Sequence, residues 1–186
     1  VFYAVDTAVT AWGPIYLSSD DVFTAPPTSP AMYALATLPY LAAVLLARVV
    51  GDAATARFGA PTVVRVGALT AFLGLAVVVF APASSWPVAV LGFFVVGLGV
   101  AAIAPLAFSA AARVAGEGAD PALHRARVDA VVARFNQFNY AGALIGSVLT
   151  GALGSTSLRV GFAVPMVLVL ALVPLARHFT SVGSLD

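Results

Sequence analysis

Long apolar runs alternate with short polar connections along this chain. Five runs approach or exceed the about 20 mostly apolar residues that a helix needs to cross the hydrocarbon core of a bilayer. They cover residues 31–50, 62–81, 87–112, 130–153 and 158–176. A sixth run, residues 1–17, is shorter, and we interpret it as the outer end of a helix whose start lies upstream. The pattern predicts an all-α fold in one domain over residues 1–186, a polytopic membrane bundle of six transmembrane helices with the first truncated.

Composition supports a bilayer as the main solvent of this chain. Of its 186 residues, 61% are hydrophobic and 9% are charged, whereas a soluble domain has roughly 45–50% apolar residues. The mean hydropathy is +1.03. The net charge of +1 leaves no basic face for a nucleic acid once the arginines are placed. The chain has no cysteine, which removes disulfide frameworks and thiolate metal sites from consideration.

Basic residues between the runs predict the orientation, because cytoplasmic loops carry the excess of Arg and Lys. Of the nine basic residues, all of them arginine, only Arg159 falls on one side of the predicted bundle. The others are Arg48, Arg57, Arg65, Arg113, Arg125, Arg127, Arg134 and Arg177. We therefore expect both termini in the cytoplasm, Asp20 and Asp21 outside, and a location in a bacterial cytoplasmic (inner) membrane.

The segment "RVVGDAATARFGAPTVVR", residues 48–65, is predicted to be a cytoplasmic hairpin between the second and third helices. Gly51 and Gly59 supply the backbone freedom that a turn requires. Asp52 follows Arg48 by four residues, one helical turn, so the two side chains can face each other at the helix end. An arginine-rich loop that only sets the orientation is the alternative interpretation.

The order of residues in "GDAATARFG" resembles the signature loop of the major facilitator superfamily, in which a Gly, an acidic residue and Arg-x-Gly lie between the second and third helices of each six-helix half. The longer form, "RVVGD" followed by "RFG" and a later Arg, is most similar to bacterial transporters related to sugar permeases. Further along, "GLGVAAIAPLAFSAAAR" and "FNYAGALIGSVLTGALG" resemble the fourth and fifth helices of that subgroup's C-terminal half. One departure is Ala56, which stands where the family has an acidic residue directly before Arg-x-Gly, while Asp52 lies one turn earlier.

The resemblance implies the C-terminal half of a twelve-helix secondary transporter that moves a small solute by alternating access, with an N-terminal six-helix half as its partner. It also implies a cytoplasmic gating loop and no cofactor. The gating residues are then Arg48, Gly51, Asp52, Arg57, Gly59, Arg65, Arg113 and Arg134.

Asp6 is the clearest charged residue within an apolar run, and charges at membrane depth are costly and usually functional. It precedes Leu17 by eleven residues, which at ~1.5 Å per residue places it about 16 Å below the outer boundary. Transporter sites lie near that midplane. We interpret Asp6 as a proton-coupled carboxylate or a solute ligand; a hydrogen bond to a neighbouring helix is the alternative.

The run at 130–153 opens with a polar cluster, Asn136, Gln137, Asn139 and Tyr140. Three of these share a helical face at three- and four-residue spacing, with Gln137 beside it. Such a face suits the wall of a water-filled pathway for solute or protons. Hydrogen bonding between helices explains it equally well.

Small residues in the same runs predict close helix packing. They are Gly92, Gly97 and Gly99 in one run, and Gly142, Gly146, Gly151 and Gly154 in another. An intramembrane hydrolase would need an embedded nucleophile and base, or metal ligands, and the sequence has no HExxH, GxSxG or paired-Glu motif. We therefore expect no enzyme. A channel or a non-transporting membrane scaffold is the alternative to a transporter.

Overall fold

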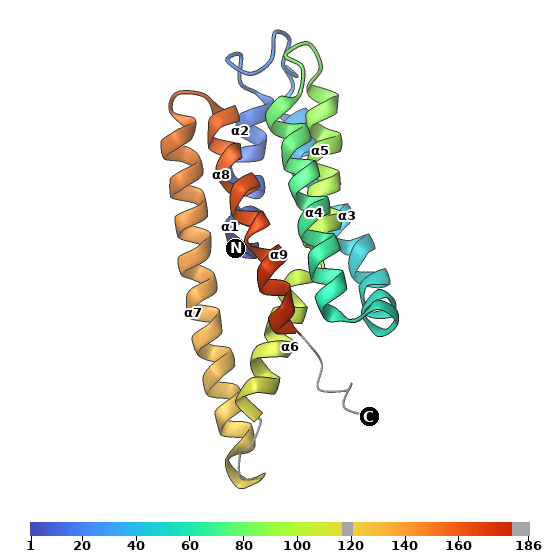
Figure 1. The fold of residues 1–186 in the computed structure, drawn as a ribbon. Coiled ribbons are helices and arrows are strands. Elements are labelled where there is room, and N and C mark those ends of the chain that lie inside the picture. The colour runs from blue at the N-terminus through green and yellow to red at the C-terminus, as the bar shows by residue number, and fades with distance from the viewer. Residues whose placement is uncertain (117–120, 180–186) are drawn as a thin grey trace.

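The computed structural model describes residues 1–116 and 121–179, and every regular element in these ranges is helical (Figure 1). Near the start, α1 (Phe2–Thr7), a π-helical turn η1 (Ala8–Trp12) and α2 (Gly13–Leu17) follow one another directly. The next elements are α3 (Pro30–Phe58), α4 (Ala60–Phe80), α5 (Trp86–Val100), α6 (Ile103–Gly116) and α7 (Pro121–Gly154). The last are α8 (Leu158–Leu170), α9 (Leu172–Leu175) and the 3-10 helix η2 (Ala176–Phe179). The all-α prediction is confirmed.

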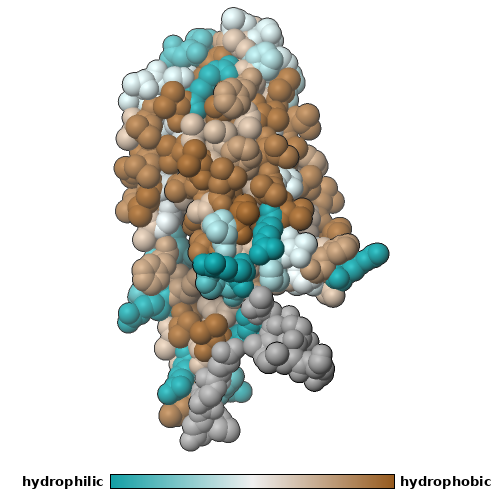
Figure 2. Space-filling view, in the orientation of Figure 1, coloured by the Kyte–Doolittle hydropathy of each residue, from teal (hydrophilic) through white to brown (hydrophobic). Residues whose placement is uncertain are grey.

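Four helical stretches in the described ranges are long and apolar enough to cross a membrane. They are Thr37–Phe58, Ala60–Phe80, Trp86–Gly116 and Leu158–Phe179. Hydrophobic side chains cover the middle of the face seen in Figure 2, with hydrophilic ones toward both ends. These features are those of a helical membrane protein, and the count of six transmembrane helices stays a prediction.

The helices differ from the predicted ranges in several places. The helix expected to end at residue 50 continues to Phe58, so Gly51 is helical and the hairpin reduces to a turn at Gly59, whose φ is +78°. The helix expected from residue 130 begins at Pro121, and the run at 87–112 is divided into α5 and α6. The reason is that apolar residues mark where a helix meets lipid, whereas Ala, Arg and Leu continue a helix into water.

The bundle is organised around α5, which packs against both α3 and α4. Beyond α4, the neighbours in order are α8, α7 and then α1, and α6 packs against α7. Four buried aromatic rings fill the interior near one end, where Tyr16 meets Phe23, Phe93 and Phe162 edge-on at centroid distances of 5.4, 6.0 and 5.1 Å. Edge-to-face pairs in this distance range are favourable beyond their buried area.

Glycines lie where these helices cross, as predicted. A Cβ added to Gly92 would lie 2.9 Å from the carbonyl oxygen of Gly74, so α4 and α5 meet backbone to backbone. Gly97 faces the backbone of Tyr40 on α3, and Gly146 on α7 faces Ala4 on α1. Gly99 and Gly151 also lie at close crossings, whereas a Cβ on Gly142 would be 4.0 Å from its nearest neighbour. Packing therefore explains most of the predicted glycine positions.

Candidate functional site

Asp6 lies half-buried near the end of α1, two residues before the π-helical turn, and is joined to α3 by a side-chain hydrogen bond. The hydroxyl of Tyr40 donates to Oδ1 of Asp6 at 2.5 Å. Thr10 donates to the backbone carbonyl of Asp6 at 2.8 Å, which leaves the carboxylate to other donors. Among the described residues, the second carboxylate oxygen accepts no hydrogen bond. Asp6 therefore holds α1 against α3 with one oxygen and keeps the other available.

Backbone packing fixes the donor of this hydrogen bond. Tyr40 is fully buried, and its own backbone carbonyl lies against Gly97, where α3 crosses α5. On the acceptor side, the π-helical turn η1 follows Asp6, and its last residue, Trp12, donates from Nε1 to the carbonyl of Ser147 on α7 at 3.0 Å. Single π-helical turns inside α-helices occur frequently at functional sites. Asp6 thus lies between α3 and α7 in a rigid frame.

A polar cavity of about 460 Å³ lies between α1, α3 and α6, further along the bundle from Asp6. Arg48, Asp52 and Thr55 line it from α3, Ser109 from α6 and Tyr3 from α1. Arg48 and Asp52 are exposed, and within the described part of the chain no ion pair joins them. Both charges are therefore free to interact with groups outside these residues. We call this end of the molecule the Arg48 end.

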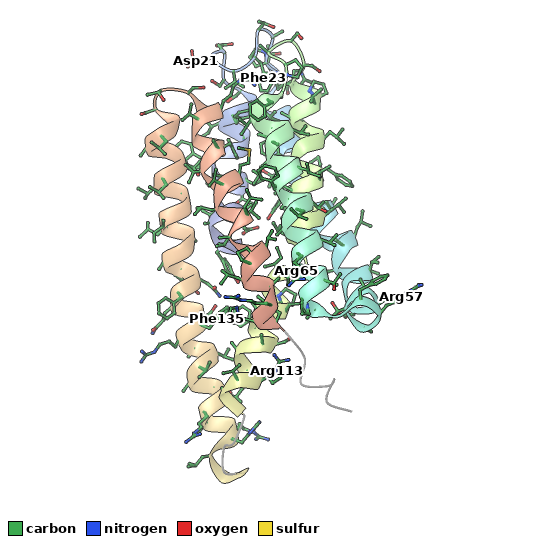
Figure 3. All side chains as sticks on the ribbon, viewed as in Figure 1. Asp21, Phe23, Arg57, Arg65, Arg113 and Phe135 are labelled. Carbon is green, nitrogen blue, oxygen red and sulfur yellow. The ribbon has the colours of Figure 1, made fainter. Side chains whose placement is uncertain are left out.

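The remaining residues of the predicted gating loop are spread over several elements. Arg57 is exposed and lies over the ring of Phe58, 5.3 Å from its centroid. Figure 3 shows Arg57 projecting away from the bundle at the α3–α4 turn. Arg65 lies on α4 and Arg113 in the last turn of α6. Arg134 lines a separate hollow of about 360 Å³ on α7. Within the described ranges, Arg48, Gly51 and Asp52 of the predicted set line the same cavity.

The polar cluster of α7 is divided between two environments. Asn136, Gln137 and Tyr140 are exposed, Tyr140 by 73%. Asn139 instead lines a mostly apolar cavity of about 500 Å³ between α1, α6, α7 and η2. Its Nδ2 is buried and has no hydrogen-bond partner among the described residues. The exposed members are available to a partner that covers α7, and Asn139 faces inward.

At the opposite end of the bundle, the side chain of Arg159 hydrogen-bonds the loop between α2 and α3 and the end of α4 to the start of α8. The sequence pattern did not indicate this role. From α8, its Nη1 donates to the carbonyls of Val79 at 3.0 Å and Ala81 at 2.5 Å. Its Nη2 donates to the carbonyl of Val22 at 2.9 Å, and the guanidinium lies 5.7 Å from the ring centroid of Phe23. We call this the Arg159 end. The available signal was a lone arginine at the start of an apolar run.

Metal-binding side chains are not gathered anywhere in residues 1–116 and 121–179: no group of three or more His, Cys, Asp or Glu residues there could hold an ion. The candidate site is therefore built from one carboxylate, its tyrosine donor, and the charged and hydroxyl groups of the Arg48-end cavity.

Comparison with known proteins found one informative similarity. The chain is 37% identical over 79 residues to "Uncharacterized transporter y4wD" of Sinorhizobium fredii (strain NBRC 101917 / NGR234). The matched segment covers 42% of this chain and 20% of that relative. No family model matches the chain, and no solved structure matches it. The similarity is to a protein named as a transporter, and the superfamily and its sugar-permease-like subgroup stay predictions.

Proposed function

We propose that this chain is the C-terminal half of a secondary active transporter of the major facilitator superfamily, which moves a small solute across the membrane by alternating access coupled to protons. The observation that carries the proposal is Asp6, an aspartate in an apolar helix that is bonded to the next long helix and keeps one carboxylate oxygen open. The length of the relative supports the assignment to a half. Since 79 residues make 20% of it, that protein is about twice as long as these 186 residues.

Protonation of Asp6 would change how strongly α1 is held to α3. A hydrogen bond to an ionised acceptor is roughly twice as strong as one between neutral groups. When Asp6 takes up a proton on its open oxygen, the bond from Tyr40 becomes a neutral one and weakens. Proton binding thereby loosens the contact between two helices, and proton release restores it. This links the ionisation state of one residue to the relative position of two membrane helices.

Arg48 and Asp52 have a different role in this proposal. They line the cavity at the Arg48 end from one face of α3, and both are exposed. Charges that are unpaired in one half of a transporter can pair with the other half when the two close. We propose that they form such contacts with the upstream half and so stabilise the state in which the Arg48 end is closed. The exposed Asn136, Gln137 and Tyr140 then line the pathway between the halves.

The test uses the full-length protein in proteoliposomes and a panel of radiolabelled monosaccharides and other small polar solutes. Asp6→Asn is expected to abolish accumulation driven by a pH gradient while exchange at equal solute concentrations continues. Asp20→Asn is the matched control, because Asp20 is an exposed carboxylate outside the helices. Loss of exchange in a folded Asp6→Asn protein would make Asp6 a solute ligand. Full activity in both assays would remove it from the mechanism.

Topology and transport class are tested separately. This chain has no cysteine, so Ala53→Cys near the end of α3 and Ser84→Cys between α4 and α5 give single labelling sites once any cysteines elsewhere in the full-length protein are replaced. Labelling from opposite sides of the membrane is expected; labelling from the same side would contradict the topology. The distribution of arginines also predicts that residue 117 faces the same side as Arg48, and this residue lies outside the described ranges. Uptake that never saturates with solute concentration would favour a channel.

A further inference from the structure

A groove of about 630 Å³ runs between α3 and α4, and α5 forms its floor. Leu46, Val50 and Phe58 of α3 form one wall, and Val66 of α4 stands in the other. Each of these four side chains is more than half exposed, from 57% to 62%. Within the described ranges, no element of the chain covers them. On helices that are apolar enough to cross a membrane, such a surface lies against lipid or against another apolar segment.

The groove follows from the way the three helices pack. Both α3 and α4 pack closely on α5 and make few contacts with each other, so they diverge above it. The side of the groove formed by α5 is deep because small residues line it there. A Cβ on Gly99 would lie 2.5 Å from the carbonyl oxygen of Gly67, so α4 and α5 touch through their backbones at this point. The groove therefore follows from how α3 and α4 pack on α5.

The groove lies on helices that can cross a membrane, and this position indicates what surrounds it. Its walls belong to two of the helical stretches that are long and apolar enough to cross a membrane, Thr37–Phe58 and Ala60–Phe80. An apolar groove on the outside of such helices opens to the hydrocarbon of the bilayer, where acyl chains are the available ligand. It ends at the α3–α4 turn, where these helices leave the apolar core.

A positively charged side chain, Arg57, lies at that end of the groove. Arg57 is exposed and lies over the ring of Phe58, which itself lines the groove. The nearest acidic side chain along α3, Asp52, lines the polar cavity instead. Guanidinium groups bind phosphate through two parallel hydrogen bonds. We propose that the α3–α4 groove is a binding site for an anionic phospholipid, whose acyl chain fills the groove and whose phosphate pairs with Arg57.

The headgroup arm of the test uses native mass spectrometry of the full-length protein. The purified protein is titrated with phosphatidylglycerol and with phosphatidylcholine of the same acyl chains. A basic residue near the membrane surface contributes about fivefold to binding of anionic lipid. Arg57→Gln is therefore expected to lower the preference for phosphatidylglycerol about fivefold. Arg65→Gln is the control, because Arg65 is also exposed but does not line the groove. Equal loss in both variants would overturn the headgroup assignment.

The second part of the test blocks the site of the acyl chain with a large side chain on α4. Val66→Trp is expected to reduce binding of both lipids severalfold, whereas Leu73→Trp, at a 60% exposed position of α4 outside the groove, is expected to leave it unchanged. A benzoylphenylalanine placed at position 66 should form a covalent adduct with the mass of a phospholipid in membranes. Cross-linking to the upstream part of the same protein instead would show that the missing half covers the groove and would overturn the proposal.

Discussion

Arg159 offers the sharpest prediction about stability, because one side chain joins three separate backbone segments. Its guanidinium donates to the carbonyls of Val22, Val79 and Ala81 from the start of α8. The loop between α2 and α3, the end of α4 and the start of α8 are thereby fixed to one another. Replacement by Leu keeps an apolar stem of similar reach and removes all three hydrogen bonds. We expect this variant to fold with a markedly lower free energy of unfolding.

The size of the loss can be worked out from these contacts. Measured hydrogen bonds in membrane proteins contribute about 0.6 kcal/mol each, with a maximum of about 1.7. Three bonds from a charged donor therefore contribute about 2–4 kcal/mol. The contact with the ring of Phe23, 5.7 Å from its centroid, adds about 0.5–1 kcal/mol. Water reaching this end of the bundle recovers a part, so Arg159→Leu is expected to cost about 2–4 kcal/mol.

Equilibrium unfolding of the full-length protein in mixed micelles, titrated with sodium dodecyl sulfate, measures this cost. Arg159→Lys keeps the charge but has no planar fork, so it is expected to lose about half as much. Arg57→Leu is the control, because Arg57 is exposed and lies over the ring of its neighbour Phe58; surface changes of this kind fall within about 0.5 kcal/mol. An Arg159→Leu protein within about 0.5 kcal/mol of wild type would refute the reasoning, as would a lysine variant with no loss.

Three further predictions use the same unfolding assay. Gly97→Ala places a Cβ against the backbone of Tyr40 and is expected to lower the free energy of unfolding by about 1–3 kcal/mol. Gly142→Ala, where the new Cβ is 4.0 Å from its nearest neighbour, should be nearly neutral; equal effects would contradict the close crossing at Gly97. Tyr40→Phe keeps the ring but removes the hydroxyl that donates to Asp6, and is expected to lower the free energy of unfolding by about 1 kcal/mol. If the same change costs nothing in an Asp6→Asn background, the two residues act together. Asn139→Leu removes a buried Nδ2 that lacks a partner among the described residues and should stabilise the protein by about 1 kcal/mol; destabilisation would show that Nδ2 has a partner outside them.

The sequence predicted which segments are helical better than it predicted where they end. Apolar runs locate helices because a backbone in lipid must satisfy its own hydrogen bonds. They do not locate helix ends, since outside the lipid local propensity decides. Residues 51–58 contain good helix formers and continue α3, and Gly59 stops it because its φ of +78° suits glycine. The gating segment was therefore expected as a loop and is mostly helix.

The hydrogen-bond partners of Asp6 and Arg159 could not be predicted from the sequence. Spacing along α1 placed Asp6 inside an apolar run, but its donor, Tyr40, is 34 residues away on another helix. Which residue of α3 meets Asp6 depends on how α1 packs against α3, and the position of Tyr40 depends also on the crossing of α3 with α5 at Gly97. The acceptors of Arg159 are backbone carbonyls, which every residue has, so no side-chain pattern could reveal them.

The two ends of the bundle resist displacement very differently. At the Arg159 end, Tyr16 also donates to the carbonyl of Val78 at 2.5 Å, and Thr24 is bonded to Ala83 through both its backbone and its hydroxyl. Any shift of a helix there breaks several hydrogen bonds at once. At the Arg48 end, helices are separated by cavities of about 460 and 500 Å³, so a shift mainly changes the volume between them. If this chain moves by the alternating access proposed above, its rocking would pivot at the Arg159 end and open or close the Arg48 end.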